Sequence, residues 1–305
     1  MFSYLGGKKF QAKWIGSYIP ISKKYVEPFG GAFWVYFQNG IEFNKNVYND
    51  YNVYLANVFY CARNKFNPFL KELQKHETQN KDLFEQFKSE LVPLKYDIEL
   101  GDVETAAKYI YIELNTFSGL TIDKAKFVDL KGKYKSKYTQ FFEKVAHPRW
   151  QYKLQTITDI QHQSYQNCIL EHDSPDTFFY IDPPYFKKES YYTKLFPQEE
   201  HNRLSKLLKK IKGRFILSYY DFDGLKDLYP KKYYHWETRK FNKQNSSKST
   251  NTEKGKEVII MNFDPKGRKK NAKGGHIKDD ADVSLTIIEI PDISESGVES
   301  LFKRR

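Results

Sequence analysis

KYVEPFGG (24–31) is a short apolar run that ends in a Gly-Gly turn, and AFWVYFQNG (32–40) directly after it predicts a helix. VYND (47–50) then predicts a second short strand, and VYLANVFYCARNK (53–65) predicts a second helix. Strand, turn, helix, strand and helix in this order are typical of a βαβ arrangement, in which neighbouring strands run parallel. The first part of the chain therefore predicts an α/β fold.

Strands and helices alternate again in the second half of the chain. FFYIDPPY (178–185) is an apolar run that two prolines stop, as expected for a buried strand. Residues 197–213 predict a helix that begins at a proline, because apolar residues recur at helical spacing from Leu204 to Ile211. Further strands are predicted at TDIQHQS (158–164), RFILSYYD (214–221), YYHWETRK (233–240) and EVIIMNF (257–263).

The middle of the chain has a different pattern. Its clearest element is VETAAKYIYIEL (103–114), whose apolar residues fall on one face of a helix. A basic loop, KGKYKSKY (131–138), follows later in the same section. We interpret residues 66–150 as an insertion of helices and loops into the α/β domain.

The remaining residues divide into the α/β domain and an extension. Residues 1–65 and 151–264 are predicted to form the α/β domain, and residues 242–256 a long polar connection between two of its strands. Residues 265–305 are a charged extension with one candidate strand at 283–290.

The composition limits the classes of function. Lys and Arg total 50 against 38 Asp and Glu, and the net charge of +12 fits a partner with a phosphate backbone. Cys61 and Cys168 form no CxxC or Cys/His pattern, which argues against a disulfide framework and a zinc site. No signal peptide and no membrane-spanning run is visible, so the expected location is the cytoplasm.

The tetrapeptide Asp182-Pro183-Pro184-Tyr185 carries the most specific chemistry. Ligands of α/β sheets bind beyond the carboxyl ends of the strands, where this segment is predicted to lie. An aromatic amine is a poor nucleophile because its lone pair is delocalised into the ring. Two acceptors on its hydrogens, the carboxylate of Asp182 and the carbonyl of Pro183, would free that lone pair, and the ring of Tyr185 could stack on a base.

Two further signals indicate a nucleoside-containing cofactor. Glycines in Glu27-Pro28-Phe29-Gly30-Gly31 would let the backbone approach a ligand closely at the turn after the first strand. Asp50 ends the next strand roughly twenty residues further on, where an acidic side chain accepts hydrogen bonds from ribose hydroxyls.

In this set of motifs the sequence resembles the Dam-like DNA adenine-N6 methyltransferases (D12 class, alpha group), especially compact phage and bacterial members. Four blocks match in the order of that class: YLGGK (4–8), EPFGG (27–31), YNDYN (48–52) and SPDTFFYIDPPY (174–185). The later strands at 213–221 and 256–263 resemble the rest of its sheet, whereas the insertion and the tail match poorly.

The resemblance implies a Rossmann-like, seven-stranded sheet of the S-adenosylmethionine-dependent methyltransferase type, with an inserted target-recognition subdomain. It implies S-adenosyl-L-methionine as cofactor, no metal, and Asp182, Pro183, Pro184 and Tyr185 as catalytic residues. Phe33 and Ser164 depart from the class, which often has a small residue and an aspartate at these positions. The expected cofactor-binding residues are Tyr4, Gly7, Lys8, Glu27, Pro28, Phe29, Gly30, Gly31, Asp50, Asn52 and Asp182.

Double-stranded DNA is the expected partner, and a cognate restriction endonuclease is a candidate second partner. The insertion would hold the sequence-reading surface, and NTFSGL (115–120) resembles a turn near the substrate-facing region of the class. The basic loop is predicted to contact phosphates through Lys131, Lys133, Lys135 and Lys137.

Two alternatives stay open from the sequence. The chain could methylate the N4 amine of cytosine or an adenine of ribosomal RNA, since enzymes of these kinds share a proline-containing strand end of the same type. It could also be a non-catalytic DNA-binding module on a degenerate methyltransferase fold, against which the intact DPPY motif and Asp50 argue.

Overall fold

The computed structural model describes residues 7–39, 43–76, 79–95, 97–116, 121–129, 137–185, 196–222, 224–242 and 254–265. These residues belong to one compact unit, Met1–Pro265. Within them, no helix is both long enough and apolar enough to cross a membrane.

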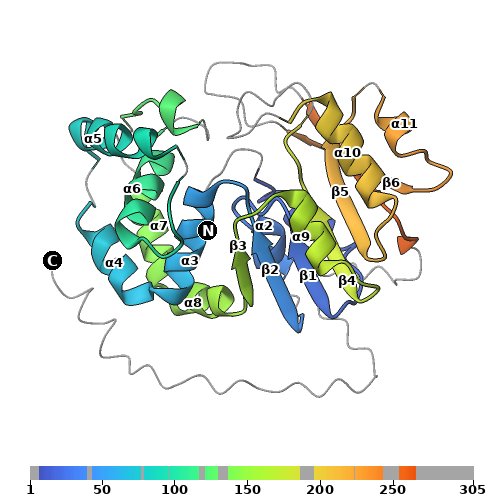
Figure 1. The fold of residues 1–305 in the computed structure, drawn as a ribbon, viewed down its shortest axis with the longest axis horizontal. Helices are drawn as coiled ribbons and strands as arrows, with labels where there is room; N and C mark the ends of the chain where they lie inside the picture. Colours follow the sequence, from blue (N-terminus) through green and yellow to red (C-terminus); the bar gives the residue numbers. More distant parts are fainter. Residues whose placement is uncertain are drawn as a thin grey trace. The chain divides into compact units, whose positions relative to one another are not determined.

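The described strands form one mixed sheet in the order β3-β2-β1-β4-β5-β7-β6 (Figure 1). The first five strands of this order run parallel, and β7 pairs antiparallel with both β5 and β6. The predicted fold class, a seven-stranded α/β methyltransferase-like sheet, is therefore confirmed. The strands are β1 (Lys24–Glu27), β2 (Lys45–Asn49), β3 (Asp159–Gln161), β4 (Thr177–Ile181), β5 (Arg214–Tyr220), β6 (His235–Asn242) and β7 (Lys254–Met261).

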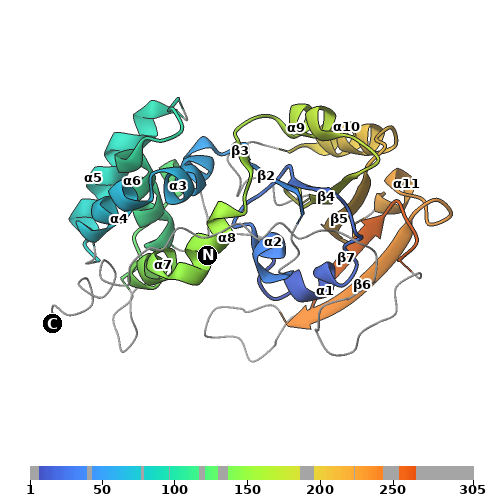
Figure 2. The same ribbon diagram turned by 90° about the horizontal axis from the view of Figure 1, so that it is seen from below.

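Helices cover both faces of the sheet. In Figure 2, α9 (Tyr165–His172) and α10 (Gln198–Leu208) lie on one side, and α1 (Ala12–Gly16) and α2 (Trp34–Asn39) lie on the other. β4 is buried along its whole length because successive side chains enter opposite cores. This two-sided burial explains why β4 reads as a continuous apolar run in the sequence.

A group of helices adjoins the β3 edge of the sheet (Figure 1). The predicted helix 103–114 is confirmed as α6 (Val103–Leu114), and its amino end is capped by Asp102, which accepts a hydrogen bond from the Thr105 backbone. The group shares one hydrophobic core with α2. The 66–150 boundaries of the insertion stay a prediction. The other helices of the group are α3 (Val53–Asn64), α4 (Phe66–Gln74), α5 (Lys81–Leu91), α7 (Lys137–Ala146) and α8 (Pro148–Gln155).

The helix predicted to reach Gly213 was placed wrongly at its carboxyl end, because α10 ends at Leu208. The Asp173 carboxylate accepts hydrogen bonds from the backbone N–H groups of Lys212 and Gly213, at 2.9–3.0 Å. These bonds hold the chain in a turn that leads into β5. The helix therefore ends before its apolar pattern ends, and a residue distant in the sequence holds the chain that follows it.

The last two strands extend further into the polar connection than predicted. Their antiparallel pairing continues from His235↔Met261 to Asn242↔Lys254. Backbone hydrogen bonds sustain this ladder beyond the apolar side chains on which the prediction depended. The candidate strand at 283–290 lies outside the described residues.

Candidate active site

A cavity opens beyond the carboxyl ends of β1, β2 and β4. Its empty space, including the part open to solvent, is about 1060 Å³. Tyr4 lies outside the described residues. The cavity is lined by all the other predicted cofactor residues and by Pro184: Gly7, Lys8, Glu27, Pro28, Phe29, Gly30, Gly31, Asp50, Asn52, Asp182 and Pro184.

The turn after β1 has a strained backbone. Gly31 has φ +50°, and Phe33 has φ +56°, a left-handed conformation that is rare for a bulky residue. The Phe33 ring packs against Tyr48 and Phe59 in the core, and its backbone N–H bonds to the Gly30 carbonyl at 2.8 Å. Aromatic packing thus holds Phe33 in place at a position where the class often has a small residue.

Gly30→Ala is expected to lower the free energy of unfolding by about 1–3 kcal/mol. A Cβ at this position would lie 2.4 Å from the Tyr48 ring. That ring cannot move freely, because its hydroxyl donates to the Gly31 carbonyl at 3.0 Å. Urea denaturation of Gly30→Ala, Tyr48→Leu and the double variant measures the effect. Fully additive losses would show that the ring is not the obstacle.

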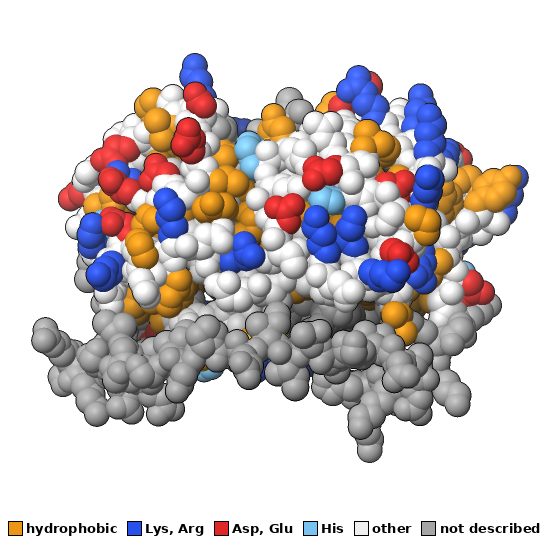
Figure 3. All heavy atoms as spheres, turned by 60° about the horizontal axis from the view of Figure 1, so that its bottom comes forward, with side chains coloured by type: hydrophobic (Ala, Val, Ile, Leu, Met, Phe, Trp, Pro, Cys, Tyr) orange, Lys and Arg blue, Asp and Glu red, His pale blue; other side chains and the backbone are white. Residues whose placement is uncertain are grey.

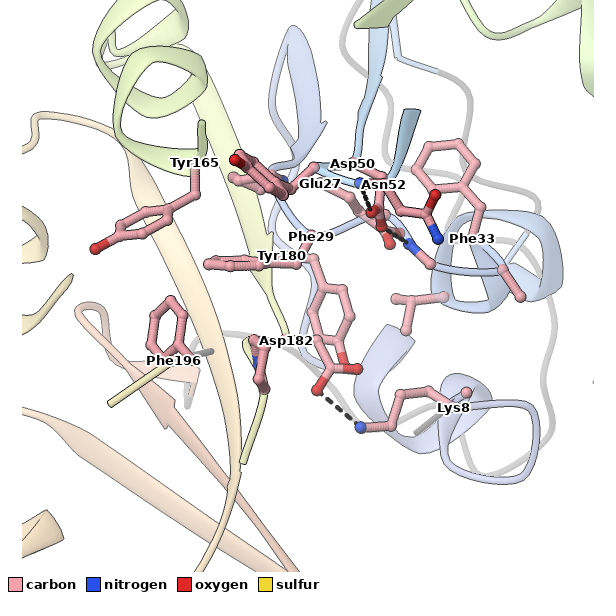
Figure 4. Close-up of a pocket in the computed structure, with 18 of the residues that line it drawn as sticks. Lys8, Glu27, Phe29, Phe33, Asp50, Asn52, Tyr165, Tyr180, Asp182 and Phe196 are labelled. Atoms are coloured by element: carbon pink, nitrogen blue, oxygen red, sulfur yellow. Dashed lines mark hydrogen bonds and ion pairs between the residues drawn. The ribbon is translucent and has the colours of Figure 1, made fainter. Parts of the chain in front are cut away.

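Asp50 fixes the turn from the end of β2. Its two carboxylate oxygens accept hydrogen bonds from the backbone N–H groups of Gly31 and Asn52, each at 2.8 Å (Figure 4). Asn52 in turn caps α3, since its side chain accepts from the N–H groups of Tyr54 and Leu55. The carboxylate is held in one orientation at the cavity wall, with remaining lone pairs that can accept ribose hydroxyls.

Asp182 lies at the end of β4 on the same cavity, and its carboxylate points toward Lys8 (Figure 4). Lys8 Nζ donates to Asp182 Oδ1 at 2.8 Å, and the two side chains are 5% and 17% exposed. Burial raises the pKa of Asp182, and the nearby ammonium acts in the opposite direction. The predicted catalytic carboxylate of Asp182 therefore contacts Lys8, one of the predicted cofactor-binding residues.

Tyr185 does not line this cavity. Its hydroxyl donates to Glu257 Oε1 at 2.7 Å, and its ring packs 4.3 Å from the ring of Tyr220. Lys8 Nζ lies 4.7 Å from its ring centroid. Pro183 is likewise not part of the lining. The predicted stacking of Tyr185 on a base stays a prediction.

The sequence interpretation missed several residues of the site. Glu257 is a buried carboxyl on β7, opposite the last residue of β5, and its place at the start of the run EVIIM was the available signal. Tyr165 and Phe196 were also missed, and they form an aromatic wall with the predicted Phe29, whose ring stacks on Tyr165 at 5.1 Å. Tyr165 follows β3 as Asp50 follows β2, so its place beyond a strand end could have revealed it.

At the end of the cavity near β3, the carboxylate comes from a different element than in the class that the sequence resembles. Ser164 caps α9 by accepting from the Asn167 N–H at 3.2 Å. Glu200 of α10 lines the cavity nearby, and it accepts hydrogen bonds from the Tyr165 hydroxyl at 2.8 Å and from the Gln166 amide at 3.3 Å. An acidic group is thus present at this end although Ser164 cannot supply one.

The cavity lining has an acidic balance. Four carboxyl side chains and one ammonium line it, which suits a ligand that carries net positive charge. Burial raises the pKa of Glu27 and of Asp50, and for Asp50 the two backbone hydrogen bonds act in the opposite direction. The charged lining side chains are Lys8, Glu27, Asp50, Asp182 and Glu200.

Both cysteines are buried, and burial raises the pKa of Cys61 to about 12. Neither thiol is a candidate nucleophile. Among the described residues, Asp159, Glu171 and His172 could together hold a metal ion, but none of them lines the cavity. The side-chain amides of Gln161 and Gln163 already donate to these carboxylates.

Most of the predicted DNA-contacting residues cannot be placed. Lys131, Lys133 and Lys135 lie outside the described residues, as do residues 117–120 of the predicted turn. Lys137 is exposed at the start of α7. Its contact with phosphate stays a prediction.

Comparisons with known proteins agree with this geometry. A family model described as D12 class N6 adenine-specific DNA methyltransferase matches residues 4–244. The chain is also 26% identical, over 230 residues, to the type II methyltransferase M.CviBI of Paramecium bursaria Chlorella virus NC1A. That alignment covers 73% of this chain and 84% of the viral protein.

Proposed function

Because the chain belongs to the D12 class of N6 adenine-specific DNA methyltransferases, we propose that it transfers the methyl group of S-adenosylmethionine to the N6 amine of an adenine flipped out of duplex DNA. The single observation that carries the proposal is the placement of Asp182 on the same cavity as Asp50 and the glycine turn. A carboxylate able to accept hydrogen bonds from an amine and a candidate nucleoside site thus share one cavity.

The cofactor fits the chemistry of the lining. When bound, S-adenosylmethionine supplies an activated methyl group on a sulfonium centre. Asp50 would accept hydrogen bonds from its ribose, and Glu27 would face its positive charge. Phe29 offers an aromatic face to the same charge.

The residues of the chain would act on the target amine. The carboxylate of Asp182 and the carbonyl of Pro183 would accept its two hydrogens, so that the nitrogen lone pair is directed at the methyl carbon. The bound cofactor would supply the methyl group and leave as the neutral thioether S-adenosylhomocysteine, and the methylated nitrogen would then lose one proton to water. Since a stacked base cannot reach such a cavity, the adenine must leave the duplex, at a cost of a few kcal/mol.

DNA is expected to approach the edge of the sheet where the cavity opens. We propose that residues 66–150 form the target-recognition part, with Lys137 among its phosphate contacts. The face in Figure 3 interleaves acidic with basic side chains, so it does not concentrate the net charge of +12. A cognate restriction endonuclease remains a candidate partner. The cytoplasm remains the proposed location.

The test is methylation of DNA from a host that lacks adenine methylation, with tritiated S-adenosylmethionine. Nucleoside mass spectrometry should show N6-methyladenine, and sequencing of the modified adenines should show one recurrent site. Labelled N4-methylcytosine, or label in ribosomal RNA and none in DNA, would favour the nearer alternatives. No label in DNA, together with no cofactor binding by calorimetry, would leave the non-catalytic DNA-binding module.

A further inference from the structure

Lys8 is a buried ammonium that lies between two carboxylates. Its Nζ is 2.8 Å from Asp182 Oδ1 and 3.6 Å from Glu257 Oε1. The Lys8 and Glu257 side chains are 5% and 1% exposed. A charge so far from water needs an ionic partner, and this one has two within reach.

In this position the ammonium occupies an acceptor expected to receive the target base. It donates to the carboxylate oxygen of Asp182, which should accept a hydrogen from the adenine amine. It also lies 4.7 Å from the centroid of the Tyr185 ring. The amine cannot donate to Asp182 Oδ1 until Lys8 releases that oxygen.

Glu257 is the group to which Lys8 can move. Its carboxylate is held by the Tyr185 hydroxyl at 2.7 Å, so it has a fixed position in the sheet. Because Lys8 Nζ is only 3.6 Å away at the end of a flexible stem, a small rotation converts this contact into a hydrogen bond. The move would exchange one buried ion pair for another.

We propose that Glu257 is a positioning residue that receives the Lys8 ammonium when the target adenine enters, which leaves the Asp182 carboxylate to the amine of the base. The inference rests on the proposed function. It explains why a buried position of β7, opposite the last residue of β5, keeps a carboxylate. It also explains why that carboxylate touches both Lys8 and Tyr185.

Glu257→Gln tests the proposal, because glutamine still accepts the Tyr185 hydroxyl but cannot hold the ammonium as an ion pair. The probe is a duplex that keeps the target adenine and carries 2-aminopurine next to it, whose fluorescence rises when the adenine leaves the stack, once sequencing has identified the site. Single-turnover methylation of the unmodified duplex should fall at least about 30-fold, and capture of the target adenine should weaken, with the cofactor Kd unchanged. Glu257→Asp keeps the charge and should recover most of the rate.

The matched control is Glu237→Gln on the neighbouring strand β6, which makes the same chemical change away from Lys8 and Asp182. This variant should methylate like the wild type. Thermal melting of all variants shows whether each one folds. Lys8→Met tests the first half of the exchange without altering Glu257, and it should capture the target adenine at least as well as the wild type.

The double variant Lys8→Met/Glu257→Gln separates the exchange from a merely structural role. With the ammonium gone, Asp182 Oδ1 no longer has Lys8 as a competing donor, so capture of the target adenine should return toward the wild-type level. A double variant as poor as Glu257→Gln alone, a fully active Glu257→Gln, or a Lys8→Met that loses capture would each overturn the inference. A wild-type protein that methylates no DNA would instead overturn the proposed function.

Discussion

Asp182→Ala should slow methyl transfer by about 100-fold to 1000-fold, which is the usual effect of removing one preorganised group from a transition state. The carboxylate accepts a hydrogen of the target amine only as the nitrogen becomes a nucleophile, so the loss should appear in kcat. The measurement is the single-turnover rate with saturating tritiated S-adenosylmethionine and unmethylated duplex. The cofactor Kd, measured by calorimetry, should change little in comparison.

The pH dependence should identify the same group. Asp182 must be ionised to accept from the amine, so the rate should fall as the pH drops through its pKa. Because burial raises that pKa, the fall should begin at a higher pH than for an exposed aspartate. Asp182→Asn keeps an acceptor oxygen without a titrating group, and its residual rate should lack this fall.

A surface variant provides the control for Asp182. Asp176 is 59% exposed, and its ion pair with Lys23 is also exposed, so Asp176→Ala should leave the rate within about twofold of the wild type. A wild-type rate in Asp182→Ala would remove the basis of the proposed mechanism, whatever family the chain belongs to.

The sequence was sufficient for those parts of the fold that local patterns determine. Helix α6 was predicted to the residue, because Asp102 caps its start and its apolar face repeats at helical spacing. The carboxyl end of α10 was not predicted. Asp173, in a distant loop, holds the residues after this helix in a turn through hydrogen bonds to their backbone. Local periodicity contains no information about such a partner.

The candidate site could likewise be predicted only in part. Residues of the matching blocks met at one cavity because they follow strands whose carboxyl ends share an edge. The contact between Lys8 and Asp182 joins residues 174 positions apart. Glu257 reaches them because β7 inserts between β5 and β6, an order that the sequence of strands along the chain does not reveal.

Asp50→Ala should weaken S-adenosylmethionine binding by about 100-fold or more, because two hydrogen bonds to a charged acceptor are lost at roughly 1.5–3 kcal/mol each. The substitution also removes the acceptor for the N–H groups of Gly31 and Asn52, so the turn itself could loosen. Calorimetry with S-adenosylhomocysteine and with its 2′,3′-dideoxy analogue separates the two causes. If Asp50 holds the ribose, the wild type should lose affinity for the analogue, whereas Asp50→Ala should bind both ligands almost equally. An equal loss for the two ligands on substitution would mean that Asp50 only shapes the turn.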